Sequence, residues 1–93
     1  MKLIYSPNFR YRLLKITNYI AKDKIGASQE FKKGLKSYLE KLSLFPYMGQ
    51  SSRFYTHQTV RELVYKGYTI IYEIEPDAIK IVDIFKWQIK EDA

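Results

Sequence analysis

Three strand-like runs at the end of the chain constrain its fold more than any other feature. Residues 59–65, 68–74 and 79–87 are rich in β-branched and aromatic side chains, which favour the pleated, half-buried surface of a sheet. A Lys66-Gly67 pair separates the first two runs, and a Glu-Pro-Asp-Ala turn at 75–78 separates the last two. Strands joined by such short turns predict an antiparallel meander. The rest of the chain must then pack on this surface.

The hairpin at Lys66-Gly67 also predicts which side chains share a face of the sheet. With a two-residue loop, Tyr65 opposes Tyr68 and Leu63 opposes Ile70. The face that the helices are expected to cover then carries these side chains: Arg61, Leu63, Tyr65, Tyr68, Ile70, Tyr72, Ile74, Ile79, Ile81 and Phe85. On the opposite face, Glu73 is expected to form a cross-strand ion pair with Lys80.

The first 21 residues predict a short strand followed by a helix. Residues 2–5 form an apolar run that is stable only as a strand added to the meander. Ser6 is a good N-cap residue, and Pro7 suits the first helical position. An apolar stripe with helical spacing follows and runs to about Ala21: Phe9, Leu13, Ile16 and Ile20.

A second helix is predicted between a break at Asp23-Lys24-Ile25-Gly26 and a stop near Leu44. Gly26 suits a left-handed helix end, Ser28 is expected to cap the new helix, and Pro46 disfavours helix at the residue before it. The apolar stripe of this helix is Phe31, Leu35, Leu39 and Leu42. We therefore predict one α+β domain over residues 1–93, of order β-α-α-β-β-β, with a helical hairpin packed on one face of a small antiparallel sheet.

Composition excludes several classes of protein. The chain of 93 residues has no cysteine and one histidine, so we expect no disulfide, no metal site and no cofactor. No apolar run approaches the roughly 20 residues of a membrane span, and the first residues lack the apolar core of a signal peptide. The protein is expected to be cytoplasmic.

The positive charge is concentrated in the first half of the chain. Residues 10 to 41 contain nine Lys or Arg against three acidic residues, which equals the net charge of +6 of the whole chain. Such a field attracts nucleic acid or an acidic protein. The alternative is a solvated helix surface that only keeps the protein soluble.

An aperiodic stretch over residues 46–58 brings together Arg53, Tyr55 and the single histidine, His57. Long loops in small domains are often functional, and arginine with aromatic residues suits a phosphate or a base. The structural alternative is a loop held by inward packing of its apolar residues: Tyr47, Met48 and Phe54.

The order of elements resembles the RelE/ParE superfamily of toxin-antitoxin toxins over essentially the whole chain. The resemblance is carried by three strand motifs, Val60-Arg61-Glu62-Leu63, Gly67-Tyr68-Thr69-Ile70-Ile71-Tyr72 and Ile81-Val82-Asp83-Ile84-Phe85, and by Phe45-Pro46 followed by Gly49 and Arg53. It implies a toxin neutralised by a cognate antitoxin, whose acidic, partly disordered segment would fold on the basic helices or on a sheet edge. Operator DNA would be bound only through the antitoxin complex. A homodimer remains open.

RelE-like members are implied to cut messenger RNA on the ribosome. Under that reading the catalytic candidates are Arg53, His57, Glu62 and Lys86, with Glu62 or His57 as base and the two cations on the scissile phosphate. However, Val64 stands where a RelE-like chain carries an arginine, and neither arginine nor tyrosine follows Trp87.

ParE-like members are implied to poison DNA gyrase by binding it, which requires no catalytic residue. The Arg-Glu-Leu run and the missing nuclease residues favour this reading, although Lys86 stands about where ParE-like chains commonly have a histidine. Arg61 and Asp83 are then expected to form a structural ion pair. Candidates for contact with the target or with RNA are Tyr55, Trp87, Lys32, Lys33 and Lys36. A third hypothesis is an inactive module that binds an antitoxin or DNA.

Overall fold

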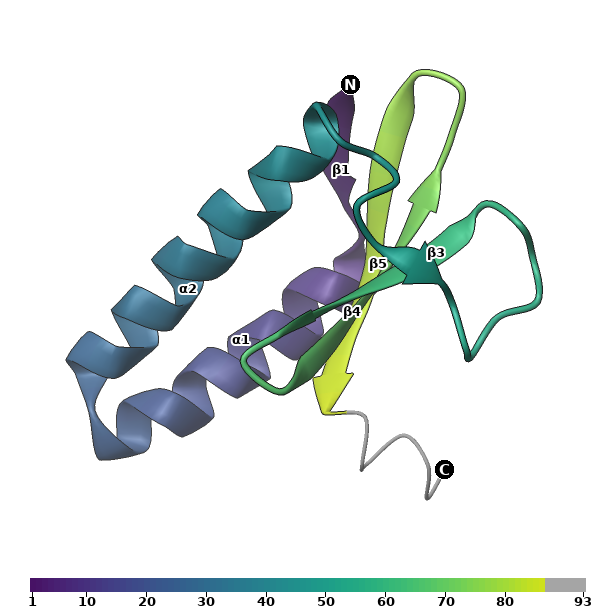
Figure 1. Ribbon diagram of the computed structural model, residues 1–93. Helices are drawn as coiled ribbons and strands as arrows, with labels where there is room; N and C mark the ends of the chain where they lie inside the picture. Colours follow the sequence, from purple (N-terminus) through teal and green to yellow (C-terminus); the bar gives the residue numbers. More distant parts are fainter. Residues whose placement is uncertain (87–93) are drawn as a thin grey trace.

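The computed structural model describes residues 1–86 and confirms the predicted α+β order with one added strand (Figure 1). The elements are β1 (Lys2–Tyr5), α1 (Pro7–Asp23), α2 (Ile25–Glu40), a 3₁₀ turn η1 (Lys41–Ser43), β2 (Gln50–Ser51), β3 (Val60–Tyr65), β4 (Tyr68–Ile74) and β5 (Ala78–Lys86). No helix within residues 1–86 is long and apolar enough to cross a membrane. The short strand β2 lies inside the stretch that the sequence predicted to be a loop.

The five strands form one mixed sheet of order β1-β5-β4-β3-β2. The three-strand meander is antiparallel as predicted, with Leu63 opposite Ile70 and Tyr65 opposite Tyr68. β1, however, pairs in parallel with β5, from Lys2 opposite Ala78 to Tyr5 opposite Ile81. The predicted antiparallel pairing is therefore confirmed for β3 to β5, β2 is also antiparallel to β3, and the parallel pairing of β1 makes the sheet mixed. Parallel neighbours need a long connection between them, and the helical hairpin and the meander together supply it.

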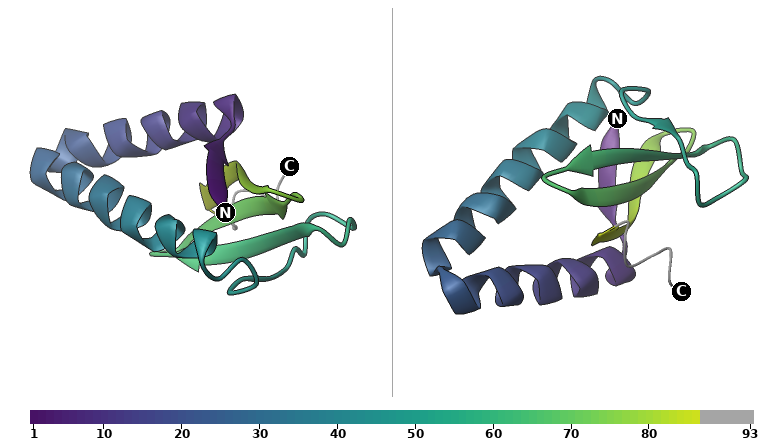
Figure 2. Two further views of the ribbon diagram at one scale, coloured as in Figure 1. Left: turned by 90° about the horizontal axis from the view of Figure 1, so that it is seen from above. Right: turned by 60° about the horizontal axis from the view of Figure 1, so that its bottom comes forward.

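The two helices form an antiparallel hairpin whose closed end projects beyond the sheet (Figures 1 and 2). α1 begins as predicted, because the Ser6 hydroxyl accepts a hydrogen bond from the Phe9 amide at 3.0 Å. The helices break at Lys24, inside the predicted stretch 23–26, but Gly26 does not form a left-handed helix end, and the predicted cap at Ser28 was wrong. Lys24 alone separates the helices, in an extended conformation (φ −146°) that needs no glycine. Ser28 lies within α2, where its hydroxyl donates to the Thr17 carbonyl at 2.7 Å and ties the helices together.

The main core lies between the helical hairpin and the predicted face of the sheet. Its buried residues are Phe9, Phe31, Leu35, Leu39, Leu42, Leu63, Ile70, Tyr72, Ile79, Ile81 and Ile84. The α-helical part of α2 ends at Glu40, earlier than predicted, and η1 carries Leu42 into this core.

A register shift in β5 corrects one predicted face. Ile71 opposes Asp83 whereas Tyr72 opposes Ile81, so the ladder skips Val82 between them. An extra residue of this kind, a β-bulge, reverses the alternation beyond it. Ile84 therefore joins the main core, and Phe85 belongs to a second cluster with Val60 and Ile71.

Candidate functional site

The loop between β2 and β3 is held to the sheet by a buried carboxylate. Glu62 lies on β3 and is 1% exposed. Its Oε2 accepts from Arg53 Nε at 2.8 Å and contacts Arg53 Nη2 at 2.8 Å, and its Oε1 accepts from the Arg53 backbone amide at 2.8 Å. Arg53 and Glu62, two of the four nuclease candidates, therefore lie together in an ion pair that holds the loop against the sheet.

The apolar residues of the stretch 46–58, which the sequence predicted to be a loop, are only partly inward-facing. The Phe54 ring packs edge-on against Phe85 at 5.3 Å between centroids, and Met48 packs against the main core. Tyr47 is 69% exposed, so its predicted inward packing was wrong. Its ring instead lies under the Arg61 guanidinium, 5.1 Å from ring centroid to Cζ. Tyr55 is exposed as well.

His57 takes part in a second, separate set of contacts. Its Nδ1 lies 2.7 Å from the Thr59 hydroxyl, and Thr59 Oγ1 donates to Glu73 at 3.0 Å. Glu73 opposes Lys80 in the ladder, as the predicted ion pair between them requires. The hydrogen bond that the Glu73 carboxylate accepts within residues 1–86 comes from Thr59. No hydrogen bond or ion pair within residues 1–86 joins His57 to either Arg53 or Glu62.

Lys86 lies at the far end of β5, opposite Tyr68 in the ladder. Its Nζ is 5.3 Å from the centroid of the Tyr68 ring. Glu62, by contrast, opposes Ile71 and Gln50, toward the other end of the meander. The structure brings Arg53 and Glu62 together, and it places His57 and Lys86 in two other surroundings. Trp87 lies outside the described residues.

The predicted ion pair between Arg61 and Asp83 was wrong. Asp83 Oδ1 lies 3.4 Å from Arg12 Nε, because α1 packs across β5. The Arg61 guanidinium donates to the Gly49 carbonyl.

Tyr72 and Gly49 form a junction that sequence reasoning missed. The Tyr72 hydroxyl accepts from the Gly49 amide at 3.1 Å and donates to the Pro46 carbonyl at 2.7 Å. Burial raises the pKa of Tyr72, and hydrogen bonds from Gly49 and Arg61 oppose that shift. The spacing of Pro46 and Gly49 in the sequence could have indicated a special turn there. Nothing in the sequence indicated that the partner of this turn is Tyr72, 23 residues after Gly49.

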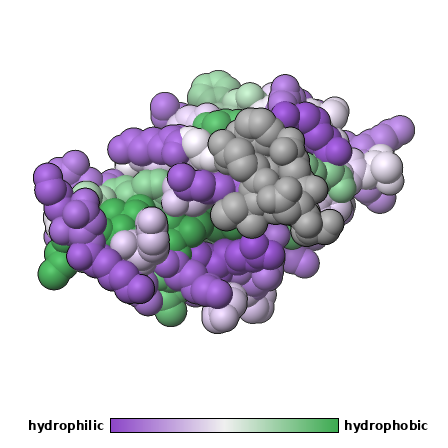
Figure 3. All heavy atoms as spheres, turned by 90° about the horizontal axis from the view of Figure 1, so that it is seen from below, coloured by the Kyte–Doolittle hydropathy of each residue, from purple (hydrophilic) through white to green (hydrophobic). Residues whose placement is uncertain are grey.

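A groove of about 390 Å³ runs between α1 and α2. Most of the residues that line it are apolar, and three of them are cations: Arg10, Lys32 and Lys36. The other lining residues are Tyr5, Phe9, Leu13, Leu14, Thr17, Leu35 and Leu39. Two of the predicted contact residues, Lys32 and Lys36, therefore line a groove, and Lys33 is exposed on the same helix. Figure 3 shows hydrophobic side chains exposed between hydrophilic ones on the face seen from below.

Comparison with solved structures identifies a chain with the same fold. A chain described as "Chromosomal ParDE TA system from P. aeruginosa" matches with a TM-score of 0.77 at 15% sequence identity, over 92% of this chain and 95% of that chain. A family model described as "ParE toxin of type II toxin-antitoxin system, parDE" matches residues 3–87, and the chain belongs to this ParE toxin family. A search of curated protein sequences gave no match.

Proposed function

We propose that this protein is a growth-arresting toxin that acts in the cytoplasm by binding and poisoning DNA gyrase, and that a cognate antitoxin neutralises it. Membership of the ParE toxin family supports the toxin role. The observation that favours binding over RNA cleavage is the Arg53–Glu62 pair. It commits two of the four nuclease candidates to each other, with the Glu62 side chain fully buried.

Cleavage of RNA by its own 2′-hydroxyl requires a base within hydrogen-bond reach of that hydroxyl and cations on the phosphate. Glu62 is closed off from solvent, and Arg53 directs Nε and Nη2 at it. His57 contacts Thr59, and Lys86 lies over Tyr68. Within residues 1–86, no hydrogen bond or ion pair joins the Arg53–Glu62 pair to His57 or Lys86, and poisoning by binding does not need these side chains to converge on a phosphate.

The groove between α1 and α2 is the surface that we propose for the antitoxin. Its floor of Phe9, Leu35 and Leu39 suits the apolar face of an amphipathic helix, and Arg10, Lys32 and Lys36 suit acidic residues beside that face. An acidic segment that is disordered when free would fold on this groove, so neutralisation would be coupled to folding.

The first test is to induce the chain in a bacterium without antitoxin and to label DNA and protein synthesis in short pulses. The proposal predicts that DNA synthesis stops first, while translation continues and a DNA-damage response rises. An immediate halt of translation would refute it and favour messenger RNA cleavage. If neither process changed while the protein accumulated in soluble form, an inert antitoxin- or DNA-binding module would replace the toxin.

One variant compared with the parent sharpens this test. His57→Ala removes the exposed one of the two candidate bases, and since His57 is exposed the fold should persist. Growth arrest by the His57→Ala protein should equal that of the parent. Purified parent and variant should both inhibit supercoiling by gyrase and increase cleaved DNA. A loss of toxicity in His57→Ala at unchanged protein level would contradict the gyrase proposal.

A further inference from the structure

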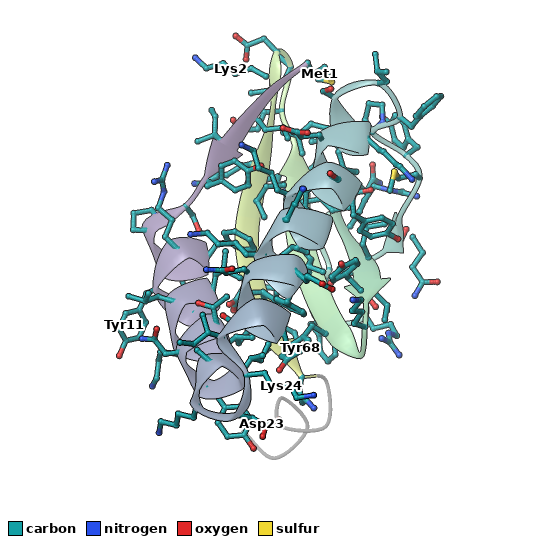
Figure 4. All side chains as sticks on the ribbon, turned by 90° about the vertical axis from the view of Figure 1, so that its left-hand side faces the viewer. Met1, Lys2, Tyr11, Asp23, Lys24 and Tyr68 are labelled. Atoms are coloured by element: carbon teal, nitrogen blue, oxygen red, sulfur yellow. The ribbon has the colours of Figure 1, made fainter. Side chains whose placement is uncertain are left out.

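A second cleft, separate from the groove between the helices, opens between α1 and the ends of β4 and β5. Its volume is about 420 Å³, within the roughly 300–1,000 Å³ of ligand pockets. Positions 12, 15, 16 and 19 of α1 form one wall, and residues 84–86 of β5 with Tyr68 of β4 form the other. The end of the molecule that carries Tyr68 is opposite the end that carries Met1 and Lys2 (Figure 4).

The charged residues that line this cleft are all cations: Arg12, Lys15 and Lys86. The carboxylate of Asp83 lies 3.4 Å from Arg12 Nε and offsets the charge of that guanidinium, so the net positive charge of the cleft comes from Lys15 and Lys86. Lys15 and Lys86 are exposed. A cleft with charge of one sign focuses the field and concentrates anions, and compact ammonium groups bind phosphate as point charges.

Aromatic rings alternate with these cations. Tyr19 is 72% exposed on α1, and the Tyr68 ring lies beneath Lys86. Burial raises the pKa of Tyr68, and the neighbouring Tyr19 raises it further, so the Tyr68 hydroxyl remains a hydrogen-bond donor at neutral pH. Ile16 and Ile84 complete an apolar floor.

We propose that this cleft binds a segment of single-stranded nucleic acid, with phosphates on Lys15, Lys86 and Arg12 and a base stacked on Tyr19. Cations along a groove together with exposed aromatic faces are the features by which proteins hold single strands without sequence preference. An acidic peptide would be matched by the cations but would leave the exposed Tyr19 ring without a stacking partner. The shared chemistry fits both single-stranded DNA and single-stranded RNA.

Binding of labelled oligonucleotides to the purified full chain tests this site, measured by fluorescence anisotropy. The probes are single strands of about 12 nucleotides, oligo(dT) and oligo(U), and a DNA duplex of equal length. Both single strands should bind more tightly than the duplex. Tyr19→Ala should weaken single-strand binding by about 5- to 100-fold, as expected for one lost stacking contact, and should leave duplex binding within about 2-fold. If only one of oligo(dT) and oligo(U) bound, that probe would identify the nucleic acid.

Two variants with equal loss of charge separate the cleft from the overall positive field. Lys15→Gln/Lys86→Gln neutralises the cleft, whereas Lys2→Gln/Lys41→Gln neutralises two exposed lysines outside it. The first should reduce the slope of log affinity against log salt by about 1.4, from about 0.7 per phosphate contact in single strands. The second should reduce it by less than half as much.

Equal effects of the two double variants would overturn the proposal, because binding would then follow net charge alone. Tighter binding of the duplex than of both single strands would also overturn it, as would stronger competition by oligo-glutamate than by unlabelled oligonucleotide. The assay contains no gyrase. Its failure would therefore leave the proposed function untouched, and a failure of the gyrase assays would leave this site untouched.

Discussion

Arg53 and Glu62 form an ion pair in which the cation is half-exposed and the anion is fully buried: the Arg53 side chain is 54% exposed and the Glu62 side chain 0%. This difference in exposure matters because the two side chains differ in how easily they can reach water when their partner is removed. Arg53 can return to water if it loses its partner, whereas Glu62 cannot without opening the loop. Removing either residue should therefore have different consequences for folding.

Arg53→Met should destabilise the protein more than Glu62→Gln. The first leaves a buried carboxylate without its cation, which costs about 3–5 kcal/mol. The second leaves a neutral amide whose NH2 faces an N–H donor of Arg53, while the guanidinium can turn to water, and it should cost about 1–3 kcal/mol. Urea unfolding of both variants and of the double variant gives the coupling energy. A larger loss in Glu62→Gln than in Arg53→Met would contradict the asymmetry.

Tyr72→Phe should destabilise the protein and also change its response to alkaline pH. The variant leaves the Gly49 amide and the Pro46 carbonyl without their shared partner, which should cost about 1–3 kcal/mol. Burial raises the folded-state pKa of Tyr72 above the ordinary value of about 10, so the folded protein favours the protonated phenol. The contribution of this phenol to stability is therefore fully present below pH 10 and is lost as the pH rises from there through the folded-state pKa.

Unfolding free energies between neutral pH and the alkaline range test this sign. The parent should lose more stability with rising pH than Tyr72→Phe, and the gap between them should narrow above pH 10. Tyr11→Phe is the matched control, since Tyr11 is 61% exposed, and it should change stability by less than about 0.5 kcal/mol. An unchanged gap across the pH range would show that the Tyr72 phenol does not titrate against folding.

Gly49→Ala and Gly26→Ala should shift stability in opposite directions. A Cβ on Gly49 would lie 2.5 Å from the Glu62 carbonyl oxygen and 2.7 Å from the Tyr72 hydroxyl, and such overpacking costs about 1–3 kcal/mol. A Cβ on Gly26 meets nothing within 4 Å, so alanine should stabilise α2 by about 0.5–1 kcal/mol. Thermal unfolding of the two variants distinguishes these outcomes, and a stable Gly49→Ala protein would show that the junction can open.

Leu14→Glu should weaken antitoxin binding without unfolding the toxin. Leu14 lines the groove between α1 and α2 and is 58% exposed, so glutamate there keeps its solvation but repels an acidic helix. Leu44→Glu is the matched control, because Leu44 is 76% exposed and outside the groove. Co-expression with the antitoxin should rescue growth for Leu44→Glu and fail for Leu14→Glu. Equal rescue of both variants would exclude the groove as the antitoxin surface.

The elements were predictable from the sequence where local signals and long-range packing agree. The hairpin at Lys66-Gly67 fixed the register of β3 and β4 because Lys66 and Gly67 both adopt positive φ, as the turn requires. The Ser6 cap was predictable for the same local reason. The parallel placement of β1 was not, since four residues cannot indicate which strand they join.

The candidate site was harder to predict because its contacts depend on tertiary geometry. Glu62 was expected to be a catalytic candidate, yet the loop that carries Arg53 folds back over it. The bulge at Val82 turned Phe85 away from the main core, a change that strict alternation cannot foresee. Asp83 pairs with Arg12 and not with Arg61, because the packing of α1 on β5 brings Arg12 close to the Asp83 carboxylate.

The pairing of β1 with β5 also determines when this domain can fold during synthesis. Lys2 pairs with Ala78 and Tyr5 with Ile81, so β1 has no neighbour in the sheet until β5 has also left the ribosome. Such pairing between distant residues raises the contact order and slows folding. A nascent chain therefore exposes the unpaired β1 and the basic helices until β5 has been made, and during that interval an antitoxin made nearby would meet a toxin that is not yet folded.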